Sequence, residues 1–544
     1  MGCRLARHFT RLAAGLALAL TYAAAAQAST LVYCYETSPE TFMPMQIIGQ
    51  STADATKHVY NKLVEMERGS TRLIPGVAES WTVSDDGLVY TFKLRKGVKW
   101  HSTSYFKPTR ELNADDVMFT FERQRNPEHP WHKVGGGRYA LFVSMGLDQL
   151  IKRIEKLDSH TVRFSLGKPT VAFPAMLAVE TFGIVSAEYS DLMMKAGTPE
   201  KTATEPIGTG PFAFVSYQKD AMIRYRAHPD HWARSVPGMD DRTAKVDNLV
   251  MLITIDPSVR YAKLKAGECQ IMRFPNPADI KLMRADPDIQ VHEIPGADYA
   301  FLGYNTEKKP FQDKRVRLAL SLAIDKKNIM DAVYLGETGI AAGALIPPSL
   351  PGHDPSIKPY PYDPERAKKL LAEAGYPNGF TADLWAMPVV RVYMPNARRT
   401  AELVQADLAK VGVTVNIKTV EWGQYLKRTQ DGEHEMVILG WNYPNADPGQ
   451  IPVLGWSCVA ARNGFNRSRW CHKEFDDLIF KAEVTKDEAQ RLALYRSAQK
   501  LFYDEAPAIL IAYATKLAMT RKSVVGYKLT PVGSETFFGV GLKE

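Results

Sequence analysis

Hydrophobic positions along this chain alternate between a period of two residues and a period of 3.6. In residues 89–95, VYTFKLR, the side chains of Tyr90, Phe92 and Leu94 fall on one face, which predicts a half-buried strand. The same alternation recurs in two further segments, 161–166 and 212–217. Asn113 stands at the N-cap of a helical pattern that begins at residue 114, with acidic residues in its first turn.

The clearest unit runs from residue 363 to residue 420. Asp363 and Pro364 are typical of a helix start, and Gly375 is typical of its end. Three elements are expected after it: a strand over 381–388, a helix over 396–410 and a strand over 413–420. A strand–helix–strand crossover of this kind predicts an α/β fold with parallel strands.

The first 28 residues have the pattern of a secretory signal. Arg4, Arg7 and Arg11 precede an apolar run over 12–26, and a small-x-small motif ends at Ala28. A membrane anchor is the alternative, but the run is shorter than the ~20 residues that a span needs. We expect residues 1–28 to be a cleaved Sec-type signal and the mature protein to be exported and soluble.

Composition places the chain among globular proteins. It has 544 residues, of which 45% are hydrophobic and 24% charged, enough for a large core. The formal net charge is +8, and the signal contributes three arginines and no acid to it. The remaining charge of about +5 is not concentrated in one basic run, so no nucleic-acid partner is expected.

Export changes the interpretation of the cysteines. Removal of Cys3 with the signal leaves Cys34, Cys269, Cys458 and Cys471. An even number in an oxidising compartment predicts two disulfides, with three possible pairings. Local pairing of Cys458 with Cys471 closes the shortest loop and would leave Cys34 to pair with Cys269. No CxxC or HExxH spacing is present, so no metal is expected.

Several longer motifs occur together in the mature chain. They are VAESWTVSDDGLVYTFKLRKGVKWH, NADDVMFTFERQ, GTGPF, IPGADYAFLGYN, KPFQDKRVRLALSLAIDKKNI and EWGQYLKR. Together they resemble family 5 of the bacterial extracellular solute-binding proteins, which serve peptide ABC importers, and most closely its dipeptide-binding members. The resemblance covers essentially the whole mature chain. It implies a periplasmic protein that delivers its ligand to permease subunits in the inner membrane, and the two disulfides paired above match the dipeptide-binding pattern.

The resemblance also implies an architecture. The family fold is α/β with two lobes that close over a ligand, and the first lobe carries an extra subdomain. No polar linker divides this chain, so we expect the lobes to exchange strands. The expected boundaries are 29–296 plus 515–544 for lobe I, 62–199 for its extra subdomain and 297–514 for lobe II. The chain is expected to cross between the lobes near 294–300 and 511–517.

Three residues match ligand-binding positions of the dipeptide-binding relatives. Arg391, in AMPVVRVYMPN, occupies the position that binds the peptide carboxylate, and a guanidinium suits this role because its fork matches a carboxylate. The alternative is a surface arginine after a strand. Tyr393 and Trp422 match pocket-lining aromatic residues, with ordinary core packing as the alternative.

The partner for the ligand ammonium departs from the family pattern. In the relatives an aspartate follows the GW pair by three residues, whereas this chain has Pro444, which offers neither charge nor N–H. Asp447 could substitute, or could be a turn aspartate before Pro448. The expected ligand is a di- or other short peptide; the alternatives are a modified or γ-linked peptide such as glutathione, or haem.

Enzymatic functions are not supported by motifs. The chain contains no GxSxG, no P-loop and no GxGxxG, so neither catalysis nor a cofactor is expected. An exported hydrolase is the alternative from another functional class, and a metal-chelate transporter protein is a weaker alternative within the same fold. We expect a monomer.

Overall fold

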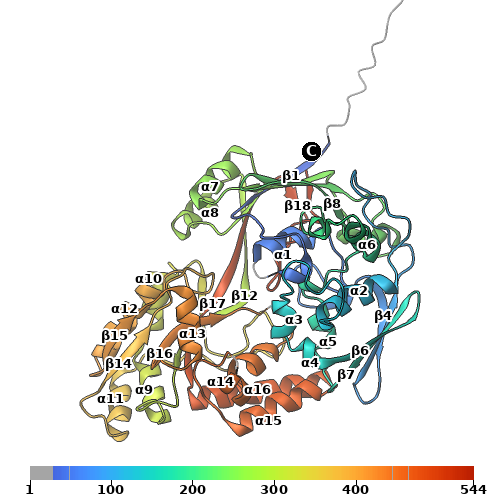
Figure 1. The fold of residues 1–544 in the computed structure, drawn as a ribbon. Coiled ribbons are helices and arrows are strands. Elements are labelled where there is room, and N and C mark those ends of the chain that lie inside the picture. The colour runs from blue at the N-terminus through green and yellow to red at the C-terminus, as the bar shows by residue number, and fades with distance from the viewer. Residues whose placement is uncertain (1–27, 48–49, 444, 464, 544) are drawn as a thin grey trace, which may run out of the picture.

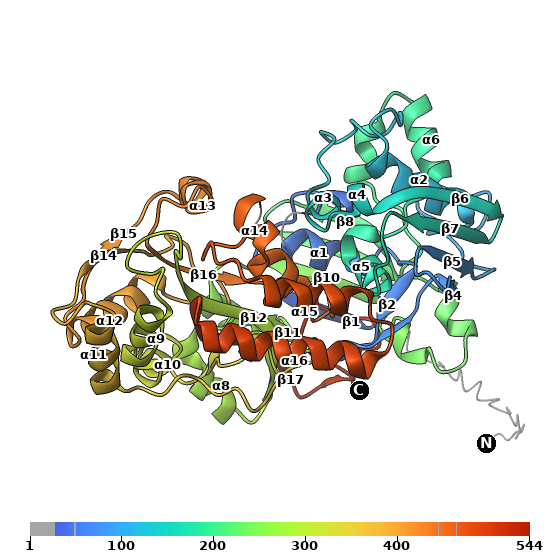
Figure 2. The ribbon, with the colours of Figure 1, turned by 90° about the horizontal axis from the view of Figure 1, so that it is seen from below.

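The computed structural model describes residues 28–47, 50–443, 445–463 and 465–543. Apart from Ala28, the expected signal over 1–28 lies outside the described residues. The largest element is an eleven-stranded mixed sheet in the order β15-β14-β16-β12-β17-β11-β1-β10-β9-β8, with β13 paired to β17. Figures 1 and 2 show two lobes, one on each side of the central strands β12 and β17. The fold is therefore the expected two-lobe α/β architecture.

Two long antiparallel strands connect the lobes. They are β12 (Ile289–Tyr304) and β17 (Ala508–Arg521), which pair along most of their length. The register shifts between Pro295 and Tyr299. Because both strands run from one lobe into the other, the lobes share one sheet, as expected from the absence of a polar linker.

The first lobe is built around β1 (Thr30–Tyr35). This strand lies between β10 and β11 and runs parallel to both. The other elements of this half of the sheet, with the helices and short hairpins around it, are β8 (Phe212–Gln218), β9 (Met222–Ala227), β10 (Asn248–Ile253), β11 (Ile271–Arg273), α1 (Gln50–Lys57), α7 (Pro257–Ala266), α8 (Ile280–Ala285), β2 (Val64–Met66), β3 (Leu73–Pro75), β18 (Val524–Val525) and β19 (Gly541–Leu542).

A separate four-stranded antiparallel sheet lies at the edge of the first lobe, in the order β4-β5-β7-β6. The strand and helix predictions here are confirmed. Helix α2 begins after Asn113, whose side chain accepts the Asp115 N–H at 2.9 Å, while Asp116 accepts the Asn113 N–H at 3.0 Å. The elements are β4 (Ala78–Val83), β5 (Val89–Leu94), β6 (Ile151–Asp158), β7 (Thr161–Leu166), α2 (Ala114–Arg125), α3 (Ala140–Ser144), α4 (Leu147–Leu150), α5 (Phe173–Leu177) and α6 (Ala187–Lys195).

The second lobe contains the predicted crossover. Strands β14 (Thr381–Trp385) and β15 (Thr414–Lys418) pair in parallel and are joined by α12 (Ala397–Ala409). The remaining elements of this lobe are β13 (Gly339–Ala341), β16 (Met436–Trp441), α9 (Lys314–Ala323), α10 (Lys326–Val333), α11 (Pro364–Glu373), α13 (Trp422–Gln430), α14 (Cys458–Asn463), α15 (Lys473–Val484) and α16 (Glu488–Glu505).

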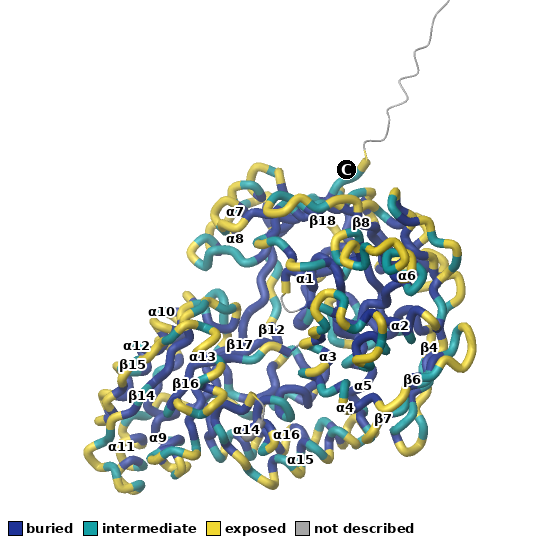
Figure 3. The backbone as a smooth tube through the Cα atoms, viewed as in Figure 1, coloured by how far each residue is buried: buried dark blue, intermediate teal, exposed yellow. Residues whose placement is uncertain are grey.

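Each lobe has its own hydrophobic core. One core is formed by residues within 31–271 and 518–540, and the other by residues within 297–514 together with Val532. Figure 3 shows the buried backbone gathered in the interior of each lobe and along β12 and β17. Two cores on one shared sheet allow each lobe to be rigid while the two crossing strands carry relative motion.

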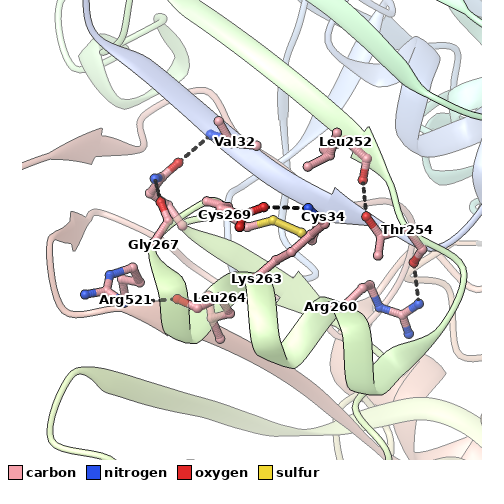
Figure 4. Close-up of a disulfide and its surroundings, with 12 residues drawn as sticks. Val32, Cys34, Leu252, Thr254, Arg260, Lys263, Leu264, Gly267, Cys269 and Arg521 are labelled. Carbon is pink, nitrogen blue, oxygen red and sulfur yellow. Dashed lines mark hydrogen bonds and ion pairs between the residues drawn. A yellow bond between two sulfur atoms is a disulfide. The ribbon is translucent and has the colours of Figure 1, made fainter.

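The structure joins the four mature cysteines in two disulfides, Cys34–Cys269 and Cys458–Cys471, which are the expected pairs. Figure 4 shows the first of them, between β1 and the turn after α7. It is buried beside Leu264 and Met272, in a small apolar cluster of the first lobe. Among the described residues, no helix is long and apolar enough to cross a membrane.

The lobes also meet away from the crossing strands. The Val171 N–H donates to the Glu483 carbonyl at 3.1 Å, and the Lys486 ammonium donates to the Ser84 carbonyl at 3.2 Å. These bonds connect the loops that follow β7 and β4 in the first lobe with the end of α15 and the turn between α15 and α16. Figure 2 shows these two helices extending beneath the first lobe.

Candidate ligand-binding site

Arg391 lies in the loop that follows β14, next to the space between the lobes. A narrow turn holds its backbone, because Arg391 and Met394 exchange N–H···O bonds of 3.1 and 2.9 Å. Its guanidinium donates to the Val390 carbonyl at 3.0 Å and lies 5.0 Å from the centre of the Trp422 ring. Within the described residues no carboxylate forms an ion pair with Arg391, so this cation is open to a ligand anion.

Trp422 and Tyr393 fix the surroundings of that guanidinium. Trp422 begins α13, whose first turn is capped by Glu421, and its ring stacks on Tyr425 at 5.7 Å. Tyr393 is 4% exposed and covers Gly440 of β16, where an added Cβ would lie 2.3 Å from the Tyr393 ring. Burial raises the pKa of Tyr393, and the nearby Arg391 charge opposes this rise. The structure thus brings the three predicted residues together.

A cleft of about 590 Å³ opens beside Arg391. Both lobes and a crossing strand form its walls: the first lobe contributes 273–277, the second lobe contributes 332–338 and 390–396, and β17 contributes 515–517. Because this cleft lies between the lobes, movement of one lobe relative to the other opens or closes it. Its charged lining residues are Arg273, Arg391 and Lys516.

A group of buried charges lies behind the first-lobe wall of the cleft. Arg273 pairs with Glu535 at 2.7 Å, with 4% and 1% of the side chains exposed. Burial raises the pKa of Glu36 to about 7, and repulsion from Asp54 adds to this rise. Burial raises the pKa of Asp54 to about 6, with Arg273 opposing the rise and Glu535 adding to it. One oxygen of each of these two carboxylates, together with the Tyr33 hydroxyl, is buried without a hydrogen-bond partner among the described residues.

A second, smaller cavity of about 130 Å³ lies between the first-lobe helix α3 and the end of β16. Its walls are mainly apolar and include Met145, Trp441, Ile451 and Phe465. Nearby in the chain, four buried polar groups have no hydrogen-bond partner in the part of the chain that the structure describes: Trp441 Nε1, the Tyr443 hydroxyl, Asn445 Nδ2 and Gln450 Oε1. Unsatisfied polar groups beside an apolar cavity are typical of a ligand site.

Asp447 is committed to contacts within the second lobe. One carboxylate oxygen pairs with Arg491 at 2.6 Å, and the other accepts the Gly449 N–H at 2.8 Å. The Asp447 N–H in turn donates to the Asn445 side chain at 2.9 Å. These bonds are those of a buried turn aspartate, the second of the two interpretations of the sequence. Pro444 lies outside the described residues.

Sequence motifs did not indicate Lys516, Arg273 or Glu535. One signal was available for Lys516, because it interrupts an otherwise almost continuous apolar run over 508–519. Nothing in the local sequence connects Arg273 of β11 with Glu535, which lies between β18 and β19 and meets Arg273 only in the fold. Among the described residues, no group of three or more His, Cys, Asp or Glu side chains could hold a metal ion.

The fold and the cleft agree with the comparisons to known proteins. Residues 72–463 match the family model of bacterial extracellular solute-binding proteins, family 5, and the chain belongs to this family. It is 51% identical to the dipeptide-binding protein of Escherichia coli K12 over 531 residues, which cover 97% of this chain and 98% of that protein.

Two further relatives match this chain over a similar share of its length. The chain is 45% identical to heme-binding protein A of Haemophilus influenzae over 527 residues, covering 96% of this chain and 94% of the relative. The solved structure of HbpA2 from Haemophilus parasuis superposes with a TM-score of 0.89 at 42% identity, covering 95% of this chain and all of that one.

Proposed function

We propose that this protein is the solute-binding component of an ABC importer and captures short peptides between its two lobes. The observation that carries the proposal is the Arg391 guanidinium, which has no acidic partner among the described residues and lies against the Trp422 ring beside an interlobe cleft. A buried peptide carboxylate needs a cation, and a guanidinium supplies two parallel N–H donors. Relatives across the whole chain length that are named for dipeptide binding support the same function.

The rest of the proposal follows from the architecture. The lobes, 29–296 plus 515–544 and 297–514, rotate about the crossing segments of β12 and β17, and the ligand stabilises the closed form. The protein acts in the periplasm after removal of its signal, hands the intact peptide to membrane permease subunits, and performs no catalysis. Tyr393 and Trp422, which lie outside the lining of this cleft, hold Arg391 in place for the ligand.

Haem is a second candidate because one relative is named for it. None of the described residues that line the cleft beside Arg391 is a histidine, cysteine, methionine or tyrosine, the side chains that bind haem iron. The composition of this cleft therefore favours a peptide. Titration with haemin, followed by its absorption spectrum, distinguishes the two ligands.

Substitution of Arg391 tests the peptide function directly. Arg391→Ala leaves the ligand carboxylate buried and unpaired. The binding free energy of Ala-Ala, measured by isothermal titration, should therefore become less favourable by about 2–5 kcal/mol. Arg391→Lys should also weaken binding, because a point charge does not reproduce the fork.

Arg398→Ala is the matched control. The Arg398 side chain is 62% exposed on α12 and, of the residues that the structure describes, pairs only with Glu402 of the same helix, so its loss should leave affinity unchanged. Mass spectrometry of the recovered Ala-Ala should show it intact. Equal affinities of wild type and Arg391→Ala, or release of free alanine, would contradict the proposed function.

A further inference from the structure

Lys516 brings a second positive charge to the cleft that contains Arg391. It lies on β17 opposite Ile294, where the strand passes between the lobes, and it lines the cleft with Thr515 and Leu517. Lys516 is 7% exposed, and within the described residues its ammonium forms neither a hydrogen bond nor an ion pair. A buried ammonium without an acceptor is costly, so an anion in the cleft would lower its free energy.

Three acidic residues lie near enough to influence Lys516, and within the described residues none of them forms an ion pair with it. Glu535 pairs with Arg273, and Asp54 accepts the Glu535 N–H at 2.9 Å. Asp298 of β12 is buried near Lys516 without such an ion pair. Burial lowers the pKa of Lys516, while Asp298, Glu535 and Asp54 oppose that shift and Arg273 adds to it. The acids thus favour the charged ammonium without making direct contact with it.

The lining of the cleft is unbalanced in charge. It contains three cations, Arg273, Arg391 and Lys516, and no carboxylate. Arg273 is neutralised by its ion pair with Glu535, which leaves Arg391 and Lys516 as two cations that pair with no carboxylate of the described residues. We propose that Lys516 is a second carboxylate-binding residue and that the preferred ligands are short peptides with two carboxylates, one held by Arg391 and one by Lys516. This inference rests on the proposed function.

Two kinds of peptide supply a second carboxylate. One is an α-linked peptide with an acidic side chain, and the other is a γ-glutamyl peptide, whose α-carboxylate stays free. A peptide without an acidic group, such as Ala-Ala, would occupy Arg391 and leave Lys516 unpaired. The shared chemistry is the second carboxylate, and its position on the ligand is what the probes below distinguish.

The test uses peptides that differ only by a carboxylate or an amide. Affinities are measured by isothermal titration for Ala-Glu against Ala-Gln, Glu-Ala against Gln-Ala, and γ-Glu-Ala against its α-carboxamide. In the wild type, at least one acidic peptide should bind about tenfold or more tightly than its amide counterpart. A preference confined to γ-Glu-Ala identifies the γ-linked source, and a preference for Ala-Glu or Glu-Ala identifies the side chain.

Lys516→Gln should abolish this preference and leave the affinity for Ala-Ala within about threefold of wild type. Lys522→Gln, an exposed lysine just beyond β17, is the control and should retain the preference. Thermal unfolding verifies that each variant is folded.

Three results would overturn the inference: no preference for a carboxylate in the wild type, a preference that survives Lys516→Gln, or an equal loss for acidic and neutral peptides. Failure of the proposed function is seen separately, as undiminished binding of every peptide by Arg391→Ala.

Discussion

Arg391 and Arg491 are chemically identical residues in opposite surroundings. Arg391 is partly exposed, lies on an aromatic ring and has no acidic partner among the described residues. Arg491 is buried and pairs with Asp447 at 2.6 Å. An unpaired cation at a cleft can bind a ligand anion, whereas a cation in a buried ion pair already has its counterion. Residue type alone therefore does not indicate which charge in this protein is functional.

Removal of the Asp447 charge should affect stability and not ligand binding. Asp447→Asn removes the nearer acidic partner of the buried Arg491 guanidinium and leaves only the Glu483 carboxylate at 3.9 Å among the described residues. The free energy of unfolding should therefore fall by about 3 kcal/mol in urea denaturation. Affinity for Ala-Ala should change by less than about threefold.

Lys473→Ala is the matched control for this prediction, because it breaks an exposed ion pair with Asp477. The Lys473 side chain is 87% exposed and the Asp477 side chain 62%. It should cost less than about 1 kcal/mol. If Asp447→Asn abolished peptide binding at unchanged stability, Asp447 would be the ammonium partner.

Asp54 should make stability depend on pH. Burial raises its pKa to about 6 in the folded protein, whereas its ordinary value is about 3.9. The folded state holds this proton more tightly than the unfolded state, so its contribution to stability falls as pH rises from about 4 to about 6 and stays low above that.

Asp54→Asn removes this cost while the side-chain oxygen can still accept the Glu535 N–H. The variant should be more stable than wild type at pH 8, by an amount on the order of 2 kcal/mol, and should show little gain at pH 4. Denaturant unfolding at both pH values measures the difference. A gain of the same size at pH 4 and pH 8 would contradict a role for ionisation.

At the scale of elements, the disulfides cross-link residues within each lobe, whereas two strands connect the lobes. Cys34–Cys269 joins β1 to the turn before β11, within the first lobe, and Cys458–Cys471 closes a short loop in the second. Neither disulfide crosses between the lobes. Strands β12 and β17 do cross, and their register shifts between Pro295 and Tyr299, near the expected crossing. The covalent cross-links therefore stiffen each lobe and leave the connection free to bend.

The two disulfides should differ in their contribution to stability. Replacement of Cys458 and Cys471 together by serine should lower the free energy of unfolding by about 3 kcal/mol, because their loop is short. Replacement of Cys34 and Cys269 should cost more, about 5 kcal/mol, since 235 positions separate them. Denaturant unfolding without reductant compares the two variants. The reverse order of stability would contradict the loop-length explanation.

At the scale of the molecule, ligand affinity and lobe closure are one equilibrium. The cleft has walls from both lobes, so a bound peptide contacts both only when they approach each other. The contacts of Val171 and Ser84 with the α15–α16 region limit where the lobes can separate. A rotation about β12 and β17 that separates the lobes at this point must therefore break these hydrogen bonds.

Saturating peptide should compact and stabilise the protein together. Ala-Ala at a hundredfold excess over its dissociation constant should add about 2.7 kcal/mol to the free energy of unfolding. The radius of gyration from small-angle X-ray scattering should decrease in the same titration. Arg391→Ala at the same peptide concentration should show smaller changes in both quantities. A stabilised protein with an unchanged radius would exclude hinge closure.

The amino-acid sequence by itself determined the local elements. Alternation of Tyr90, Phe92 and Leu94 indicated β5, and Asn113 and Asp363 marked helix starts that the structure contains. The 363–420 segment indicated a parallel crossover and hence the α/β class. These features depend on side-chain periodicity and capping, which act over fewer than about ten residues and can be recognised without tertiary contacts.

The tertiary structure alone decided the chemistry of the cleft. Arg273 meets Glu535, Asp447 meets Arg491, and Lys516 joins Arg391 in one cleft, across separations in the chain that no local pattern encodes. Local patterns treat Arg391 and Arg491 alike, and only the resemblance to the dipeptide-binding relatives singled out Arg391. The fold supplies the physical difference between them, because the electrostatic energy of a charge depends on its burial and on its neighbours in space.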